Sequence, residues 1–234
     1  CVGVDVGFLV GGVFGVYGGF GIFLVASYVL LTLGATASRV RAGIGYVMVS
    51  MASSMIFLIA LALIYASVGT VNMAHAGMRM EELPEGTRAA IFATLLVAFG
   101  IKAAAFPLDA WLPDSYPTAP APVTAVFAGL LTKVGVYAII RTEVLLFPDD
   151  RVSPMLLVAA ALTMVVGILG AVVQDDIKRM LSFTLVSHLG YMILGIAVAN
   201  QAGMAATIFY TAHHITIQAT LFLVTGLIER RGGS

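Results

Sequence analysis

The chain has 234 residues, of which 60% are hydrophobic and only 10% are charged, and its mean hydropathy is +1.04. A soluble domain carries about 25% charged residues, so this composition excludes an ordinary soluble fold and indicates a polytopic membrane protein. The formal net charge is zero, from 12 basic and 12 acidic residues, which argues against a nucleic-acid binder, because such a protein needs a basic surface. The single cysteine, Cys1, excludes a disulfide framework and a thiol metal site.

Apolar runs of about 20 residues predict membrane-spanning helices, and the sequence contains seven such runs. The predicted fold class is therefore all-α, a polytopic membrane helix bundle. Long unbroken runs argue against a β-barrel, whose strands give short alternating segments. No signal peptide is predicted, because the first stretch lacks a basic segment and a cleavage site. The predicted spans are Val6–Gly34, Ile44–Val68, Ala89–Phe106, Val123–Phe147, Pro154–Val173, Leu181–Ala199 and Ala205–Ile228.

The first span begins in an unusual segment. Residues 1–23 contain eight glycines and six valines, together with four phenylalanines. Glycine is more frequent in membrane helices than in soluble ones, but this density exceeds that enrichment. We therefore treat residues 1–23 as an atypical segment in front of an otherwise regular membrane protein.

The third span runs into a proline-rich segment. Five of the eight prolines lie between Pro107 and Pro122, and because proline removes a backbone donor and clashes with the preceding turn, this segment cannot be one continuous helix. Broken backbone at membrane depth is tolerated only where protein buries it or where it lines a wet cavity. We therefore expect a discontinuous helix here, with Trp111 at its bend. The residues assigned to the break are Pro107, Trp111, Pro113, Pro120 and Pro122.

Two lysines lie inside predicted spans, Lys102 one turn before the break and Lys133 near the middle of the fourth span. An ionised lysine at the bilayer centre costs roughly 2.5–3.5 kcal/mol, and such residues face the bundle interior and mark ion or proton paths. The alternative is a lysine whose stem is buried while its ammonium group reaches the interface. The small residues around both lysines, Gly100, Ala103, Gly129 and Gly135, predict close helix contacts.

Histidines occur inside the last two spans, His188 in the sixth and the pair His213 and His214 in the seventh. Histidine titrates near neutral pH and can pass protons, so we include all three in the predicted proton pathway, with neutral packing as the alternative. No metal site is predicted, because metal-binding pairs on a helix sit at i, i+4 and no carboxylate or thiol lies nearby. No cofactor and no catalytic residue are predicted, since no nucleotide loop or nucleophile motif is present.

The connections carry most of the charge, and the basic residues are divided unevenly between the two sides of the membrane. One side would carry six and the other three, or four with Arg141, so the positive-inside rule predicts that the first side is cytoplasmic. The first set is Arg39, Arg41, Lys178, Arg179, Arg230 and Arg231, and the second is Arg79, Arg88 and Arg151.

Several stretches resemble the antiporter-like proton-translocating subunits. This superfamily includes membrane subunits of respiratory complex I, membrane-bound hydrogenases and Mrp-type Na⁺/H⁺ antiporters. Within residues 24–234, the sequence is most similar to the D-subunit family of the Mrp antiporters. The stretches are FPLDAWLPDSY (106–116), APAPVTA (119–125), LLTKVGVY (130–137), QDDIKRMLS (174–182) and HHIT (213–216).

The resemblance implies a function and a set of site residues. Lys102 matches the lysine of the broken helix, Lys133 matches the next lysine along a hydrophilic axis, and His213 and His214 lie where the family carries polar groups leading onward. The implied protein is a subunit of a multisubunit antiporter in a bacterial cell membrane, which exchanges protons for Na⁺ or another monovalent cation and is not an enzyme. The alternatives are a proton-pumping subunit of a quinone-reducing or hydrogenase complex, and a structural subunit that transports nothing.

The departures from the family matter as much as the matches. A glutamate that the family places before the stretch LVASY is Gly21 here, and the family has further spans that this sequence lacks. We therefore interpret residues 1–234 as a single incomplete transmembrane domain with an antiporter-like core at 24–234, and we expect the fragment alone to be inactive. Residues 1–23 are explained either by an out-of-frame translation, which would remove the glutamate, or by a divergent and inactive paralogue.

Overall fold

The computed structural model describes residues 2–147 and 153–232, so Cys1 and Arg151 lie outside the described residues. Within them, seven helices are long and apolar enough to cross a membrane, which confirms the predicted all-α membrane bundle. These are α2 (Val13–Leu31), α3 (Ala37–Val68), α5 (Glu85–Ala103), the continuous rod Ala121–Leu146, α9 (Ser153–Val172), α10 (Ile177–Ala197) and α11 (Gln201–Gly232). The rod consists of α7 (Ala121–Val126), the π-helical segment η2 (Phe127–Leu131) and α8 (Thr132–Leu146). The shorter helices are α1 (Val2–Leu9), α4 (Met73–Met80), α6 (Trp111–Ser115) and η1 (Tyr116–Thr118).

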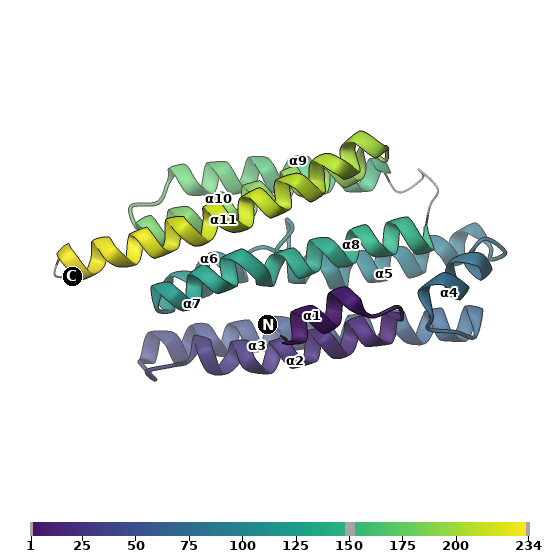
Figure 1. Ribbon diagram of the computed structural model, residues 1–234, viewed down its shortest axis with the longest axis horizontal. Helices are drawn as coiled ribbons and strands as arrows, with labels where there is room; N and C mark the ends of the chain where they lie inside the picture. The colour runs from purple at the N-terminus through teal and green to yellow at the C-terminus, as the bar shows by residue number, and fades with distance from the viewer. Residues whose placement is uncertain (1, 148–152, 233–234) are drawn as a thin grey trace.

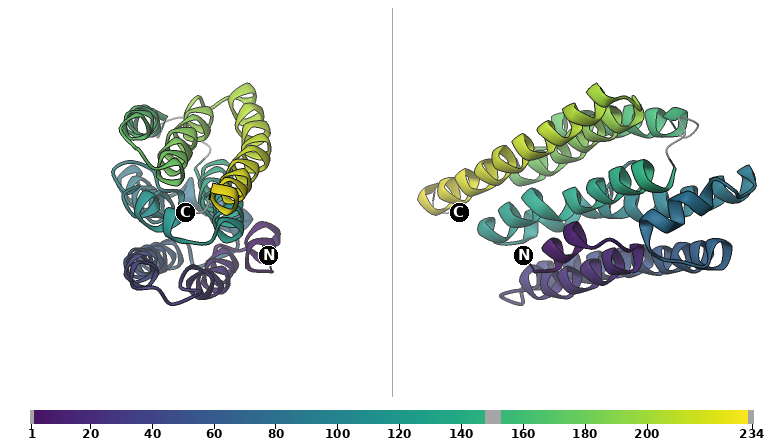
Figure 2. Two further views of the ribbon diagram at one scale, coloured as in Figure 1. Left: turned by 90° about the vertical axis from the view of Figure 1, so that its left-hand side faces the viewer. Right: turned by 45° about the vertical axis from the view of Figure 1, so that its right-hand side comes forward.

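The helices form three layers, which are seen along the bundle in Figure 1 and end-on in Figure 2. Helices α1, α2 and α3 make the lowest layer in Figure 1, α5 and the rod make the middle layer, and α9, α10 and α11 make the uppermost layer. The rod is the most buried of the long helices, because elements of both outer layers pack against it. A side chain on the inner faces of α5 or the rod is therefore enclosed by other helices.

The two ends of the bundle carry different connections. The α2–α3 connection, the α9–α10 connection and the C-terminal end of α11 lie together at the left in Figure 1, whereas α4 and the α10–α11 connection lie at the right. We call the first of these the basic end, because all six basic residues of the larger predicted set belong to it. Its cytoplasmic orientation stays a prediction. The six residues are Arg39, Arg41, Lys178, Arg179, Arg230 and Arg231.

The first predicted span, Val6–Gly34, is wrong in one respect, because it is not a single helix. The chain breaks between α1 and α2, where Val13 N donates to Val71 O at 2.9 Å and Met73 N donates to Gly11 O at 3.1 Å. The backbone here pairs with the α3–α4 connection, and that pairing replaces the helical hydrogen bonds that a continuous helix would need. Glycine has no Cβ and loses more backbone freedom in a helix than other residues, so it is a natural breaking point.

Helix α1 lies directly against α2, as Figure 1 shows. A Cβ on Gly3 would lie 2.6 Å from Phe23 N, and a Cβ on Gly19 would lie 2.8 Å from both Gly3 O and Gly7 N. Real Cβ atoms do not approach backbone this closely, so larger residues would push the two helices apart. Part of the glycine density at the N-terminus therefore has a packing reason.

The predicted break in the third span is present between α5 and α7. Helix α5 ends at Ala103, and Ala104 turns the chain out of the helix with a left-handed φ of 54°. The short elements α6 and η1 follow before α7 begins. A hydrogen bond from Phe106 N to Thr163 Oγ1, at 3.0 Å, ties the broken segment to α9. Among the prolines of the break, Pro107 precedes α6, Pro113 lies inside it, Pro120 caps α7 and Pro122 lies in the first turn of α7.

Candidate functional site

Lys102 lies at the C-terminal end of α5 and is only 7% exposed. Its Nζ donates to Ser50 O at 3.2 Å and lies 5.9 Å from the centroid of the Phe20 ring. Ser50 is 13 residues after the first residue of α3, which places it about 20 Å along that helix at 1.5 Å per residue. Because Ser50 is close to the middle of α3, the ammonium group of Lys102 stays at mid-depth and does not extend to an interface.

Lys133 is 2% exposed and lies at the start of α8. Its Nζ donates to Ala128 O, which belongs to the π-helical segment η2. A neighbouring carbonyl, Phe127 O, accepts a hydrogen bond from the Tyr116 hydroxyl at 3.3 Å. Single π-helical turns are frequent at functional sites, and here two carbonyls of the turn are satisfied by side chains. The head of Lys133 is therefore also held inside the bundle.

The two lysines lie on helices that touch each other beside them. A Cβ on Gly135 of α8 would lie 2.7 Å from Ala103 N and 3.1 Å from Ala103 Cα. This contact agrees with the prediction that small residues let the neighbouring helices approach. Lys102 and Lys133 are each within two residues of that contact, so the crossing point of α5 and α8 fixes their relative position.

His188 and His214 come together between α10 and α11. Their ring centroids are 4.7 Å apart, and His188 Nδ1 is hydrogen-bonded to the Tyr210 hydroxyl. His214 is 2% exposed, and neither of its ring nitrogens has a hydrogen-bond partner within the described residues. The arrangement places two imidazoles in ring contact between α10 and α11.

His213 lies apart from this cluster. Its side chain is exposed on the outer surface of α11, and its ring is parallel to that of Phe209, with centroids 6.3 Å apart. Adjacent helical residues differ by about 100° in direction, so His213 and His214 cannot both face the interior of the described bundle. The structure therefore unites two of the three predicted histidines and separates the third.

Two polar residues of α11 belong to the interior face although the sequence reasoning did not select them. Tyr210 bonds to His188, and Gln218 is 2% exposed and donates from Nε2 to Leu181 O at 2.9 Å. Tyr210 and Gln218 lie four residues before and four residues after His214. Residues at this spacing share a helix face, and that pattern could have identified them.

Asp109 is a further residue that the sequence reasoning missed. It lies between the spanning helices α5 and α7 and is only 7% exposed. Burial raises the pKa of its carboxyl group above the ordinary value of 3.8, and a hydrogen bond from its own backbone lowers it by a smaller amount. Neither Lys102 nor Lys133 forms an ion pair with it among the contacts of the described residues. Asp109 therefore does not supply either lysine with an ion-paired carboxylate.

Gly21 occupies an open position on α2. A Cβ added there would meet no atom within 4 Å, and the preceding residue, Phe20, is the one that lies against Lys102. Gly21 is exposed, so it lies on the outer face of α2, about 100° around the helix from Phe20. Within the described part of the chain, no carboxylate forms an ion pair with Lys102 or Lys133.

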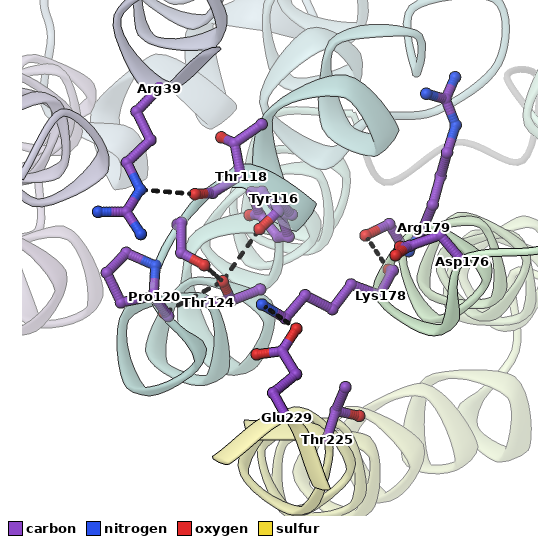
Figure 3. Close-up of polar contacts among 12 residues, drawn as sticks. Arg39, Tyr116, Thr118, Pro120, Thr124, Asp176, Lys178, Arg179, Thr225 and Glu229 are labelled. Atoms are coloured by element: carbon purple, nitrogen blue, oxygen red, sulfur yellow. Dashed lines mark hydrogen bonds and ion pairs between the residues drawn. The ribbon is translucent and has the colours of Figure 1, made fainter. Parts of the chain in front are cut away.

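The basic end holds the break in place through polar contacts, which Figure 3 shows in close-up. Arg39 Nε donates to Thr118 O at 2.9 Å, and Lys178 Nζ lies 2.7 Å from Glu229 Oε1. The Thr124 hydroxyl of α7 donates to Tyr116 O at 3.0 Å and so closes the break onto the rod. These contacts connect α3, the break, α10 and α11 at one end of the bundle.

Comparison with known proteins gives consistent matches over almost the whole chain. Residues 11–234 match the family described as NADH:quinone oxidoreductase/Mrp antiporter, transmembrane. The Na⁺/H⁺ antiporter D-subunit of Alkalihalophilus pseudofirmus is 42% identical over 235 residues, which cover 99% of this chain and 48% of that protein. The putative antiporter subunit mnhD2 of Staphylococcus aureus is 38% identical over 228 residues, covering 96% of this chain and 46% of the relative. The chain therefore spans about half the length of the curated relatives that it matches.

Two solved structures share the fold. The Mrp complex from Dietzia sp. DQ12-45-1b contains a chain with a TM-score of 0.92 and 37% identity, over 97% of this chain and 43% of that one. The membrane-bound sulfane sulfur reductase, an archaeal respiratory membrane complex, contains a chain with a TM-score of 0.92 and 28% identity, over 97% of this chain and 47% of that one. With a family match across residues 11–234 and seven apolar helices of spanning length, this multi-pass membrane protein belongs to the NADH:quinone oxidoreductase/Mrp antiporter transmembrane family.

Proposed function

We propose that this chain is part of a membrane subunit that exchanges protons for Na⁺ or another monovalent cation within a multisubunit antiporter. The observation that carries the proposal is the pair of buried lysines at mid-depth, Lys102 and Lys133, on two helices in direct contact. A buried lysine is costly in a membrane and is found where ions or protons move. Its partners would be the other subunits of the complex, the surrounding lipid, the protons and the cation.

The names of the relatives support the antiporter assignment. The relative from Alkalihalophilus pseudofirmus is named as the D-subunit of a Na⁺/H⁺ antiporter and is 42% identical, whereas the chain from the respiratory complex is 28% identical. Both cover nearly all of this chain, so the difference in identity favours the antiporter.

The proposed mechanism is a stepwise transfer along the buried polar groups. A nearby charge changes how tightly each group holds its proton. When Lys102 releases its proton, the repulsion on Lys133 falls, and Lys133 can take up a proton through ordered water. The next groups along the proposed path are His188 and His214, whose ring centroids are 4.7 Å apart, and His188 is hydrogen-bonded to the Tyr210 hydroxyl. This route does not pass through His213, which faces outward.

The test compares lysine variants in the complete protein, assembled in everted membrane vesicles. Lys102→Met and Lys133→Met keep most of the side-chain volume but cannot hold a proton. Since proton transfer by a positioned side chain contributes about 10²-fold or more, we expect Na⁺-driven proton movement, followed with a pH-sensitive dye, to fall by about that factor. Lys178→Met at the basic end is the matched control and should retain transport. Normal transport by both buried-lysine variants would refute the proposal.

A second candidate function is proton pumping within a redox complex, since the fold agrees equally well with a respiratory complex, at a TM-score of 0.92. The two functions differ in what drives proton movement. An antiporter responds to an imposed Na⁺ gradient without electron transfer, whereas a redox pump responds to electron flow and is blocked with it. Measuring proton movement under each condition in the same vesicles distinguishes them.

Two observations favour a structural role without transport. Position 21 is a glycine and not an acid. Among the described residues, no acid forms an ion pair with Lys102 or Lys133. The variant Lys133→Ala in the complete protein tests it. Unchanged transport together with normal assembly of the complex would support the structural role, whereas lost transport with normal assembly would support the proton path. Assembly is measured by co-purification of the other subunits.

A further inference from the structure

A surface pocket of about 460 Å³ lies between α7 and the C-terminal part of α11. Both segments belong to the basic end of the bundle in Figure 1. The volume is within the range of about 300–1,000 Å³ that small-molecule sites occupy. The α7 side of the pocket consists of residues 120–122, and its α11 side extends from Leu223 to Arg230. None of these residues belongs to the lysine and histidine path, so the pocket needs an explanation of its own.

Most of the pocket wall is apolar. On the α7 side, two of the three lining residues are Pro120 and Pro122, which have no backbone N–H to donate. On the α11 side, Leu223 and Leu227 line the pocket and are 48% and 57% exposed. The wall therefore offers apolar surface to a ligand rather than hydrogen-bond donors.

The charged part of the lining lies at one end of the pocket, at Glu229 and Arg230. Arg230 is seven residues after Leu223, which separates them by about 10 Å along α11 at 1.5 Å per residue. With 32 residues, α11 is about 48 Å long, whereas the hydrocarbon core of a bilayer is about 30 Å thick. The helix therefore extends into the headgroup region, where its charged C-terminal turn belongs. The pocket thus has a charged part at headgroup depth and an apolar part at the depth of the acyl chains.

The charged part carries one positive charge that no described carboxylate neutralises. The Glu229 carboxylate is ion-paired with Lys178, whose Nζ lies 2.7 Å from Oε1, and Figure 3 shows this contact between α10 and α11. These two charges cancel. Arg230 is exposed and forms no ion pair among the described residues, so its guanidinium group is available to a ligand. Arginine binds phosphate through two parallel hydrogen bonds, so the charged part is complementary to a phosphate group.

We propose that this pocket binds an anionic phospholipid, with the headgroup phosphate on Arg230 and an acyl chain against Leu223 and Leu227. A free phosphate ion would contact the guanidinium group but would leave the apolar wall unused, whereas a phospholipid fits both parts at the depths where they lie. An anionic headgroup is favoured over a zwitterionic one, because basic residues at a membrane surface attract anionic lipid. The inference concerns lipid binding alone, so it does not depend on the proposed transport.

The first experiment compares two lipids on the complete protein. The protein is reconstituted in phosphatidylcholine vesicles that contain a small fraction of phosphatidylglycerol with a photoactivatable diazirine in its acyl chain, or of phosphatidylcholine with the same acyl chain. Mass spectrometry then identifies the crosslinked residues. Crosslinks at Leu223 and Leu227 should be about five-fold more frequent with phosphatidylglycerol. Leu169 of α9 is the matched control and should show no preference, because it is 61% exposed near the same end of the bundle but lies outside the pocket.

Two results of this comparison would overturn the proposal. One is the same ratio of the two lipids at Leu223 and Leu227 as at Leu169, which would mean that the pocket does not select an anionic headgroup. The other is a lack of crosslinks at Leu223 and Leu227, as expected if a segment of the complete protein outside residues 1–234 fills the pocket. The comparison needs no variant, so it stands even if a variant fails to assemble.

The second experiment tests the role of Arg230. Arg230→Gln and Arg231→Gln each remove one exposed positive charge from the same turn, but only Arg230 lines the pocket. The vesicles contain about 0.5 M NaCl, where the screening length is on the order of 4 Å and attraction from charges outside the pocket is weak. Because a hydrogen bond to a charged group is lost, Arg230→Gln should lower phosphatidylglycerol crosslinking at Leu223 and Leu227 by about ten-fold. Arg231→Gln should leave it within about two-fold of the parent protein. An equal loss in both variants would overturn the assignment of the phosphate to Arg230.

The third experiment distinguishes a lipid from a soluble anion. An excess of inorganic phosphate is added to the vesicles with photoactivatable phosphatidylglycerol before irradiation. Crosslinking at Leu223 and Leu227 should not change, because the acyl chain holds the lipid in the apolar part of the pocket. Loss of these crosslinks would show that the pocket binds free phosphate, and would overturn the lipid proposal.

Discussion

The contact between Gly135 and Ala103 gives a sharp prediction about the lysine pair. In Gly135→Ala, the new Cβ would lie 2.7 Å from Ala103 N, whereas ordinary contacts begin at 3.4 Å. The helices α5 and α8 must therefore separate by about 0.7 Å, and extra volume in a packed core costs about 1–3 kcal/mol. Because a misplacement on the order of 1 Å can cost about 10²-fold in rate, we expect transport to fall by about 10- to 100-fold.

The matched control is Gly129→Ala in the same rod, four residues before Lys133. There the nearest atom to the new Cβ is Ile215 Cγ2, at 3.6 Å, which is ordinary van der Waals contact. Thermal unfolding of the purified complete protein and dye-monitored Na⁺-driven proton movement should both be close to the parent protein in this variant. If Gly135→Ala is as stable and as active as Gly129→Ala, the close crossing of α5 and α8 does not position the lysines and the reasoning fails.

Three further predictions concern charges and the missing acid. Replacing Lys178 and Glu229 by alanine, singly and together, should give an interaction free energy of about 0.2–1 kcal/mol in denaturant unfolding, because Glu229 is 42% exposed. An interaction free energy several times larger would mean that the pair is buried. Because burial raises the folded-state pKa of Asp109 above 3.8, its carboxyl group costs stability as the pH rises through the range above 3.8. Asp109→Asn should therefore raise the melting temperature at neutral pH and lose that advantage in acid. Gly21→Glu should assemble normally, since the position is open and exposed, and should leave transport unchanged, because residue 21 lies about 100° around α2 from Phe20, which faces Lys102; increased transport would show that an acid at this position is what limits the chain.

Much of the architecture follows from hydrophobic runs, because a bilayer demands about 20 apolar residues for each spanning helix. The seven spans and the proline break were predictable on that basis and are present. The turn between α1 and α2 was not, since residues 6–34 are apolar throughout. It depends on pairing of Gly11 and Val13 with Val71 and Met73, and a partner some sixty residues away leaves no mark in a local hydropathy pattern.

The candidate site was predictable in its residue types but not in its grouping. Burial of Lys102 and Lys133 followed from their place inside apolar runs, because a charge there is expensive and must face the interior. The separation of His213 from His214 could be anticipated only as a possibility, since a helix places adjacent residues about 100° apart and the sequence does not say which of the two faces inward. The π-helical segment η2 had no visible signal, yet it supplies the carbonyl that holds Lys133.

The structure also bears on the two explanations for residues 1–23. Gly3 and Gly19 lie where an added Cβ would be within 3 Å of backbone atoms, whereas Gly18 and Gly21 face open space. A shifted reading frame has no means of selecting glycine at points of helix contact, and the relative from Alkalihalophilus pseudofirmus aligns over 99% of this chain. We propose from these observations that residues 1–23 are a genuine but divergent segment. The gene sequence decides between the two explanations. If residues 1–23 are genuine, no shifted reading frame should encode an acid at position 21. A shifted frame that does encode one would support the out-of-frame translation.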